Sequence, residues 1–173
     1  MNKNLFLIGG TMGVGKTTVS QILKKKLPRS VFLDGDWCWD ASPFVVNDST
    51  REMVMDNVTH LLSNFIRCPE YENVIFCWVL HEEGIINEIL ARIPTDVCGS
   101  VHLLSLTSTA SALKERLQKD ITAGIRLPDI TERSIARLPL YESLPTVKID
   151  TTDRSPEEVA DLILKKQVNQ NEK

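Results

Sequence analysis

The stretch that decides the fold is Gly10-Thr11-Met12-Gly13-Val14-Gly15-Lys16-Thr17, near the start of the chain. It matches Gly-x-x-x-x-Gly-Lys-[Ser/Thr], a pattern in which backbone N–H groups of a glycine-rich turn face inward around a polyphosphate. The apolar run 5–8 before it predicts a buried strand, and residues 18–27 after it carry apolar side chains at helical spacing. In this order, the positive end of the helix would face an anion. We therefore predict a phosphate-binding loop.

Two side chains at the end of this loop suit a bound nucleotide. Lys16 would reach the β and γ phosphates, and the Thr17 hydroxyl would hold Mg²⁺. The alternative, a glycine-rich turn with a chance lysine, leaves the flanking strand and helix unexplained. The predicted nucleotide-binding positions are Gly10, Thr11, Met12, Gly13, Val14, Gly15, Lys16 and Thr17, with Thr18 following in the first helical turn.

The composition is that of an ordinary soluble globular protein, and 173 residues suit one domain with a real core. A net charge of -3 lacks the basic excess of a nucleic-acid binder. No apolar run is long enough to span a bilayer, and the first residues lead straight into the first strand, so no signal peptide is expected. The four scattered cysteines, Cys38, Cys68, Cys77 and Cys98, favour reduced thiols in a cytoplasmic protein over a zinc site or disulfides.

Strand and helix patterns alternate along the whole chain. They predict further strands at 30–33, 73–80, 100–106 and 146–150, and helices at about 50–67, 85–90, 109–122 and from 155 onward. This alternation indicates an α/β fold with a mostly parallel sheet. A polar, arginine-bearing stretch fills residues 123–143. We expect one domain over residues 1–167 and a polar tail at 168–173.

With five strands, a phosphate loop near the amino end and a basic stretch before the last strand, the chain resembles the P-loop small-molecule and nucleoside-monophosphate kinases. Shikimate kinase, gluconate kinase and chloramphenicol phosphotransferase have this general shape. The resemblance covers nearly the whole chain in its organisation, and the phosphate loop is its one specific motif. It implies a three-layer P-loop NTPase fold, with a five-stranded parallel sheet of order 2-3-1-4-5 and helices on both faces. It also implies a mobile lid at about residues 123–143.

Asp34-Gly35-Asp36, directly after the second strand, is a second match to this family. In shikimate-kinase-like proteins an Asp-x-Asp at this place faces the metal and the acceptor hydroxyl, and α/β sheets bind ligands beyond the carboxyl ends of their strands. The resemblance makes Asp36 the base on the acceptor side and places Asp34 beside the metal with Thr17. Such a base orients the attacking hydroxyl and accepts its proton. A solvated turn is the alternative, because Asp-Gly is a common turn pair.

The basic stretch is a third match, because lids of this family carry arginines that neutralise charge on the transferred phosphoryl group. Arg126, Arg133 and Arg137 are the catalytic candidates, with Arg116 as a possible fourth. Arg133 and Arg137 are four residues apart and share a helix face. Any one of these arginines could equally be a solvated surface residue.

A loop after the last strand holds the adenine in this family. The resemblance singles out Thr152, Asp153 and Arg154, with Arg154 as the predicted nucleotide contact. A plain helix start is the alternative, because Ser155 and Pro156 suit a helix cap and the position after it.

One carboxylate that many P-loop proteins carry is missing. They place an aspartate at the end of the third strand, where this chain has His81, Glu82 and Glu83. Either Glu82 or Glu83 takes its place, or Asp34 does. His81 could contact the acceptor or serve in a turn.

Three tryptophans gather near the predicted site. Trp37 and Trp39 follow the acidic pair, and Trp78 lies in the third apolar run. Their faces could stack on a ring or cover an apolar acceptor, although roofing the core is an equal alternative for each of the first two. Arg51 could pair with an anionic acceptor or stay exposed. These residues indicate a flat or apolar acceptor with at least one hydroxyl.

From these features we predict a phosphotransferase that moves the γ-phosphate of Mg-ATP to a hydroxyl or phosphate of a small metabolite, nucleoside, nucleotide or antibiotic-like compound. Its partners would be ATP and this small-molecule acceptor, without nucleic acid or membrane, in a monomer or homodimer. The alternative is a nucleotide-binding module without transfer activity, such as a sensor or a resistance protein that sequesters a ligand. A GTPase switch is disfavoured because no Asn-Lys-x-Asp occurs.

Overall fold

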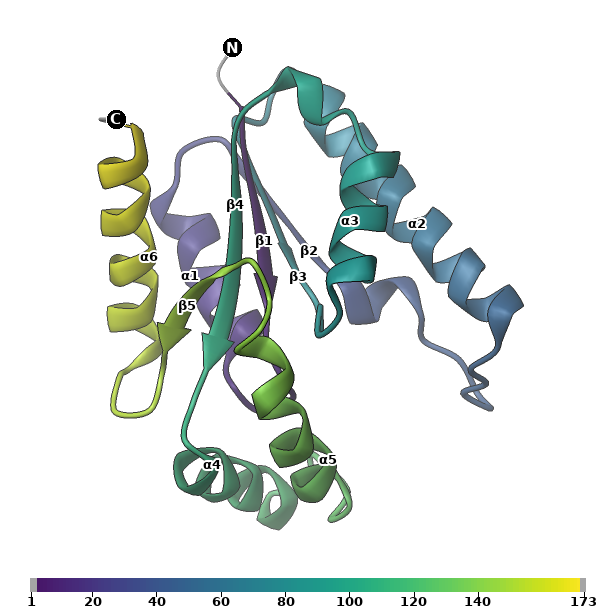
Figure 1. Ribbon diagram of the computed structural model, residues 1–173, viewed down its shortest axis with the longest axis vertical. Helices are drawn as coiled ribbons and strands as arrows, with labels where there is room; N and C mark the ends of the chain where they lie inside the picture. Colours follow the sequence, from purple (N-terminus) through teal and green to yellow (C-terminus); the bar gives the residue numbers. More distant parts are fainter. Residues whose placement is uncertain (1–2, 172–173) are drawn as a thin grey trace.

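A parallel sheet forms the centre of the computed structural model, which describes residues 3–171 and side chains up to residue 166 (Figure 1). Its strands are β1 (Lys3–Gly9), β2 (Ser30–Asp34), β3 (Asn73–Cys77), β4 (Cys98–Thr107) and β5 (Val147–Asp150). They pair in the order β2-β3-β1-β4-β5, and every pairing is parallel. The predicted fold class is therefore confirmed.

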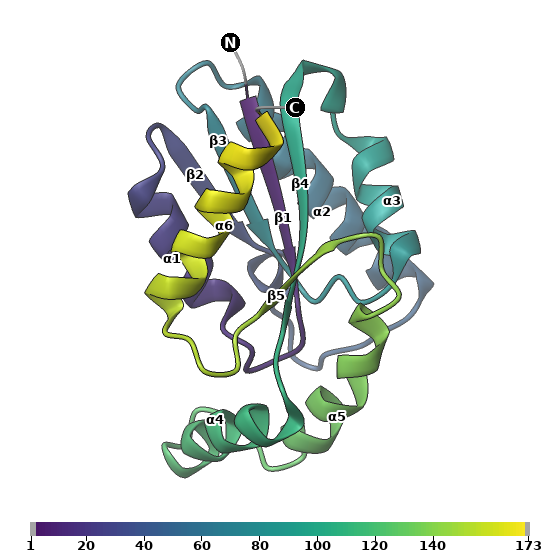
Figure 2. The same cartoon turned by 60° about the vertical axis from the view of Figure 1, so that its left-hand side comes forward.

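The helices form two outer layers and a cap at the carboxyl edge. They are α1 (Lys16–Lys26), α2 (Asp48–Arg67), α3 (Glu83–Arg92), α4 (Ala110–Thr122), α5 (Ile130–Arg137) and α6 (Pro156–Asn171), with short 3-10 turns η1 (Gly35–Cys38), η2 (Thr95–Val97) and η3 (Leu138–Tyr141). Helices α1 and α6 cover one face of the sheet, and α2 and α3 cover the other (Figures 1 and 2). Helices α4 and α5 lie beyond the carboxyl ends of the strands.

The central strands β1 and β3 are buried on both faces, which explains their nearly continuous apolar runs. On β1, Leu5 and Leu7 enter the core under α2 and α3, whereas Phe6 and Ile8 enter the core under α1 and α6. The register sets Cys77 of β3 between Ile8 of β1 and Asp34 of β2. The carboxyl ends of these strands are therefore level where the phosphate loop begins.

A third, smaller core joins the two cap helices to the phosphate loop. Leu113 and Leu117 of α4 and Ile130 of α5 are buried together, and Met12 of the loop packs against them. The cap is thus fixed to the loop by apolar contacts as well as by the chain.

The third strand is shorter than predicted, because residues 78–80 leave the sheet. Leu80 adopts φ 38°, which no strand allows, and the Val79 carbonyl accepts hydrogen bonds from the Gly10 N–H (3.3 Å) and the Tyr141 hydroxyl (2.6 Å). Leu80 is buried and Trp78 and Val79 are half-buried, so the apolar run continues past the end of the strand.

Helix ends follow local capping rules. Asn47 and Thr50 form a reciprocal capping box with hydrogen bonds of 3.0 Å, so α2 begins at Asp48, slightly before the predicted start. The backbone of α6 stays helical to Asn171, and residues 172–173 of the predicted tail lie outside the described residues. Among residues 3–171, no helix has the length and apolar content needed to cross a membrane.

Candidate functional site

The phosphate loop connects β1 to α1, and its glycines hold backbone conformations that other residues avoid. Gly10, Gly13 and Gly15 have φ values of 154°, 81° and 102°. Gly15 precedes α1 in the left-handed region and supplies no side-chain cap. The first-turn N–H groups of α1, which have no partner within the helix, are therefore not capped by it. This helix entrance suits an anion.

Helix α4 closes over the loop at Gly13. A Cβ atom at this position would lie 2.5 Å from Leu117 Cδ2, well inside van der Waals contact. Gly13 is therefore required both by its backbone angle and by the approach of α4.

Lys16 crosses the loop from the start of α1. Its Nζ donates to the Thr11 carbonyl oxygen at 3.0 Å, and the side chain is half-buried. Burial lowers the pKa of Lys16, while the Asp36 and Asp34 carboxylates act in the opposite direction. The amine thus lies close enough to both predicted acids for their charges to affect it.

Asp34 is buried, with 5% of its surface exposed, and it is surrounded by neutral donors. Its Oδ2 accepts from Thr17 Oγ1 at 2.7 Å and contacts Cys77 Sγ at 3.5 Å, and its Oδ1 accepts from the Asp36 N–H at 3.1 Å. Among the described side chains, no direct ion pair includes Asp34. A buried carboxylate in such surroundings is suited to a cation.

The other acids differ from Asp34 in their surroundings. Asp36 is exposed in η1, whereas Glu82 precedes α3 and its Oε1 lies 3.1 Å from His81 Nε2. Glu83 is exposed in the first turn of α3. Of the three carboxylates considered for the missing third-strand aspartate, Asp34 is the one in contact with the loop.

A preformed cluster of three or more His, Cys, Asp or Glu ligands is not found within the described part of the chain. Mg²⁺ in phosphoryl-transfer sites typically takes one or two protein oxygens and completes its shell with phosphates and water. Thr17 and Asp34 together fit that smaller requirement.

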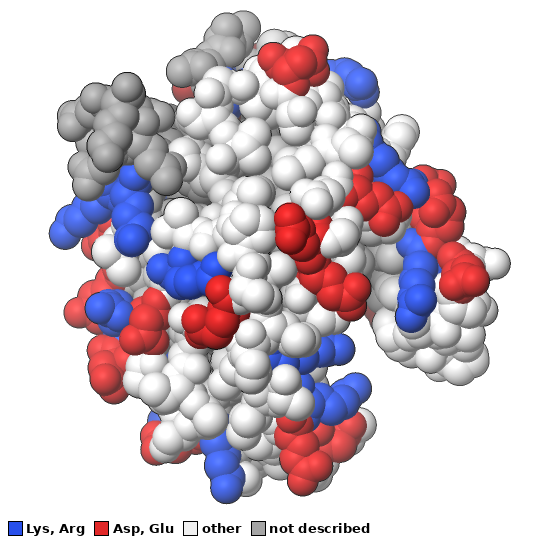
Figure 3. Space-filling model, viewed as in Figure 1, with Lys and Arg blue, Asp and Glu red and all other residues white. Residues whose placement is uncertain are grey.

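The predicted lid arginines have different surroundings. Arg137 Nη1 lies 3.0 Å from Met12 Sδ in the loop. Burial is the main cause of the lowered pKa of Lys16, and the positive charge of Arg126 acts in the same direction. Arg126 also pairs with Asp120 at 3.0 Å. Arg133 is exposed and pairs with Asp129 of its own segment at 3.2 Å. Figure 3 shows Lys and Arg side chains along a notch between the α4–α5 cap and the lobe formed by α2.

Hydrogen bonds fasten α5 and η3 to the loop. Thr11 Oγ1 donates to the Ser134 carbonyl at 2.9 Å, and the fully buried Tyr141 shares the Val79 carbonyl with Gly10. Sequence reasoning assigned no role to Ser134 or Tyr141. For Tyr141, the one sequence feature that points to a buried contact is its place directly after the apolar residues Leu138-Pro139-Leu140.

The loop after β5 is held by Arg116, which sequence reasoning considered for phosphate. Arg116 Nη1 donates to Thr151 Oγ1 at 2.9 Å, and its Nη2 donates to the carbonyl oxygens of Thr151 and Thr152, the latter at 3.0 Å. Arg154 Nη1 donates to the Asp150 carbonyl at 2.7 Å. Both arginines therefore shape this loop.

Aromatic side chains surround η1. A Cβ at Gly35 would lie 2.4 Å from Trp78 Cγ, so the Trp78 ring packs directly on this glycine. Trp39 is half-buried against Phe44, with ring centroids 4.5 Å apart, whereas Trp37 is 60% exposed. Trp78 therefore packs against the residue between the two acids, and Trp37 follows Asp36 directly in the chain.

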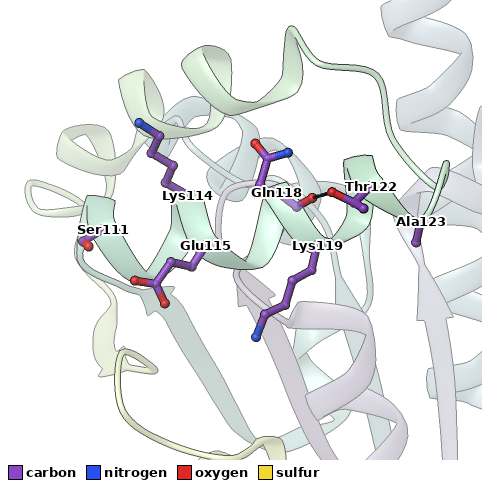
Figure 4. Close-up of a pocket in the computed structure, with 7 residues that line it drawn as sticks. All are labelled: Ser111, Lys114, Glu115, Gln118, Lys119, Thr122 and Ala123. Carbon is purple, nitrogen blue, oxygen red and sulfur yellow. Dashed lines mark hydrogen bonds between the residues drawn. The ribbon is translucent and has the colours of Figure 1, made fainter.

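A shallow groove runs along the outer face of α4 and is separate from this site (Figure 4). All of its lining residues come from α4 and the residue after it: Ser111, Lys114, Glu115, Gln118, Lys119, Thr122 and Ala123. None of the predicted site residues lines it.

The sheet order and the loop geometry define a P-loop protein of kinase-like fold. A family model described as AAA domain matches residues 7–135, and the chain belongs to that family. No curated protein matches the chain in sequence.

Solved structures share this fold over almost their whole length. A gluconokinase from Sinorhizobium meliloti is 17% identical, with TM-score 0.70, over 98% of this chain and 94% of that chain. A shikimate kinase from Acinetobacter baumannii, in complex with shikimate, is 21% identical, with TM-score 0.65, over 100% and 97%. The APS kinase of Mycobacterium tuberculosis, in complex with AMPPNP and APS, is 15% identical, with TM-score 0.65, over 95% and 96%. At these identities the likeness shows the fold.

Proposed function

We propose that the protein transfers the γ-phosphate of Mg-ATP to a hydroxyl or phosphate group of a small acceptor. The observation that carries this proposal is the 2.7 Å hydrogen bond between Thr17 and Asp34. Thr17 follows Lys16 directly in the chain, and Asp34 lies two positions before Asp36. Phosphate-binding, cation-binding and base functions thereby come together at the carboxyl edge of the sheet, where α/β proteins bind ligands.

Each side chain has one task in this proposal. Lys16 and the first-turn N–H groups of α1 hold the β and γ phosphates. Thr17 and Asp34 would hold Mg²⁺, which neutralises charge between those phosphates. Asp36 would orient the acceptor hydroxyl and take its proton as the new oxygen–phosphorus bond forms and the bond between the γ-phosphorus and the bridging oxygen breaks, so that ADP leaves. Arg137, already at the loop, stabilises the charge on the transferred group.

The remaining predicted arginines and the lid have secondary tasks. Because α5 and η3 are fastened to the loop, we propose that residues 123–129 are the closing part of the lid. Arg126 belongs to that segment and would approach the phosphates on closure, with Arg133 further out. Arg154 would contribute to the adenine contact of the loop that Arg116 holds.

The acceptor side favours a flat or apolar molecule. The exposed Trp37 follows Asp36, and the ring of Trp78 packs on the neighbouring Gly35. Arg51 Nη1 lies 4.0 Å from Asp48 Oδ1 in the first turn of α2. We propose an acceptor with an apolar face and a hydroxyl that Asp36 can reach. Four free cysteines suit the cytoplasm, where ATP is available.

The test is transfer of label from γ-labelled ATP to a panel of nucleosides, sugar acids and phenicol- or aminoglycoside-like compounds. Asp36→Asn should lower transfer about 10²–10⁴-fold, the usual range for a general base, while ATP affinity stays nearly unchanged. Asp40→Asn, an exposed acid of the same loop, is the matched control and should behave as the wild type. ATP binding without transfer to any acceptor would favour a nucleotide-binding module instead.

A further inference from the structure

Cys77 is the last residue of β3 and lies under the proposed phosphate site. It is fully buried and stands in register between Ile8 of β1 and Asp34 of β2. Its Sγ is 3.5 Å from Asp34 Oδ2. Because a carboxylate oxygen only accepts hydrogen bonds, the thiol is the donor in this contact.

The thiol is one of three donors that fix Asp34 from three directions. Thr17 of α1 and Cys77 of β3 both contact Oδ2, whereas the Asp36 N–H of η1 binds Oδ1. Asp34 is buried, and in the described structure it has no cation in direct contact. Its two oxygens are therefore oriented by neutral groups.

The position of Cys77 explains why the carboxylate comes from β2. Many P-loop proteins place an aspartate at the end of the third strand. The sequence predicted that end just before His81, but in the structure the strand ends earlier, at Cys77. An aspartate at that position would bring a second carboxylate against Asp34, and two such neighbours repel each other. A thiol occupies the same place without charge and adds a hydrogen bond.

We propose that Cys77 is a positioning residue, whose thiol holds the Asp34 carboxylate in the orientation that the divalent cation of Mg-ATP requires. This inference rests on the proposed function and deepens it. Groups that orient a metal ligand typically change metal affinity about 10–100-fold when they are removed. Cys77 would act in this way on Asp34 while touching neither the nucleotide nor the acceptor.

The experiment compares three variants by calorimetric titration with ATP, first with Mg²⁺ and then with EDTA. Cys77→Val removes the donor and keeps an apolar side chain, Cys77→Ser keeps a donor, and Cys98→Ser is the control at the opposite end of the sheet. Thermal unfolding of each variant verifies folding. The measured quantity is the ratio of ATP affinities with and without Mg²⁺.

Cys77→Val should reduce this ratio about tenfold and leave the affinity for metal-free ATP unchanged. Cys77→Ser should recover most of the ratio, and Cys98→Ser should match the wild type. A packing role would instead lower both affinities together or only the unfolding temperature. An unchanged ratio in Cys77→Val overturns the role of Cys77 and leaves the proposed function standing. A wild type that shows no Mg²⁺ dependence overturns both.

Discussion

Tyr141 and Gly10 bind the same oxygen atom. The Tyr141 hydroxyl donates to the Val79 carbonyl at 2.6 Å, and the Gly10 N–H donates to it at 3.3 Å. The turn after β3 thereby links the cap, through η3, to the first residue of the phosphate loop.

Tyr141→Phe tests the link. The ring stays buried and only the hydroxyl is lost, while the Val79 carbonyl keeps its bond to Gly10. We expect a loss of about 1 kcal/mol in the free energy of unfolding, the net worth of one hydrogen bond, measured by urea denaturation. Tyr71→Phe, at a half-buried tyrosine away from the site, is the control. Equal stability of the two variants would show that the hydroxyl contributes nothing.

Gly13→Ala tests the approach of α4 to the loop. The added Cβ would meet Leu117 at 2.5 Å, so we expect a destabilisation of about 1–3 kcal/mol from overpacking and weaker ATP binding. Gly124→Ala is a matched control, because Gly124 also has positive φ (72°) but no atom near its Cβ position. Thermal unfolding of both variants separates the steric effect from the backbone effect. If Gly124→Ala is the more damaging of the two, the contact with Leu117 is not the cause.

Arg137 and Arg133 should differ in their effect on catalysis. Arg137 contacts Met12 of the loop, whereas Arg133 is exposed and paired with Asp129. We expect Arg137→Ala to lower the rate of phosphoryl transfer about 10²–10³-fold, as the loss of one charge-stabilising donor does, and Arg133→Ala to change it much less. Steady-state kinetics of both variants decides the point. A larger loss in Arg133→Ala would reverse the assignment.

Stability should fall in mild acid because of His81. Burial lowers the pKa of His81 from 6.5, with Arg137 acting in the same direction and Glu82 opposing it. As the pH drops below the unfolded value, the unfolded chain takes up this proton before the folded one, so folding becomes less favourable. The slope is at most about 1.4 kcal/mol per pH unit for one proton.

The check is the free energy of unfolding of the wild type and His81→Asn between pH 7.5 and 5.5. The variant should show a flatter dependence, and His60→Asn, on the exposed face of α2, should follow the wild type. Parallel curves for all three proteins would contradict the assignment.

Much of the fold was predictable because its signals are local. The phosphate loop sets strand β1 and helix α1 by itself, and the alternating apolar runs locate the other strands. The strand order came from the family resemblance, and the structure confirms it.

Local signals do not suffice where tertiary contacts decide the structure. The run 74–80 is apolar throughout, and nothing in its pattern shows that Leu80 turns to φ 38° beneath Gly9. Arg116 and Arg137 are indistinguishable in the sequence, yet one holds the loop after β5 and the other reaches Met12. The roles of the individual site residues stay predictions, because they depend on ligands.

The most direct test is the affinity for Mg-ATP of Lys16→Ala, measured by calorimetry beside Lys25→Ala, an exposed lysine of the same helix. If the loop holds a triphosphate, Lys16→Ala should lose on the order of 1.5–3 kcal/mol of binding free energy, the worth of a charge-assisted contact, and Lys25→Ala should bind as the wild type does. Equal affinity in Lys16→Ala and Lys25→Ala would contradict the account.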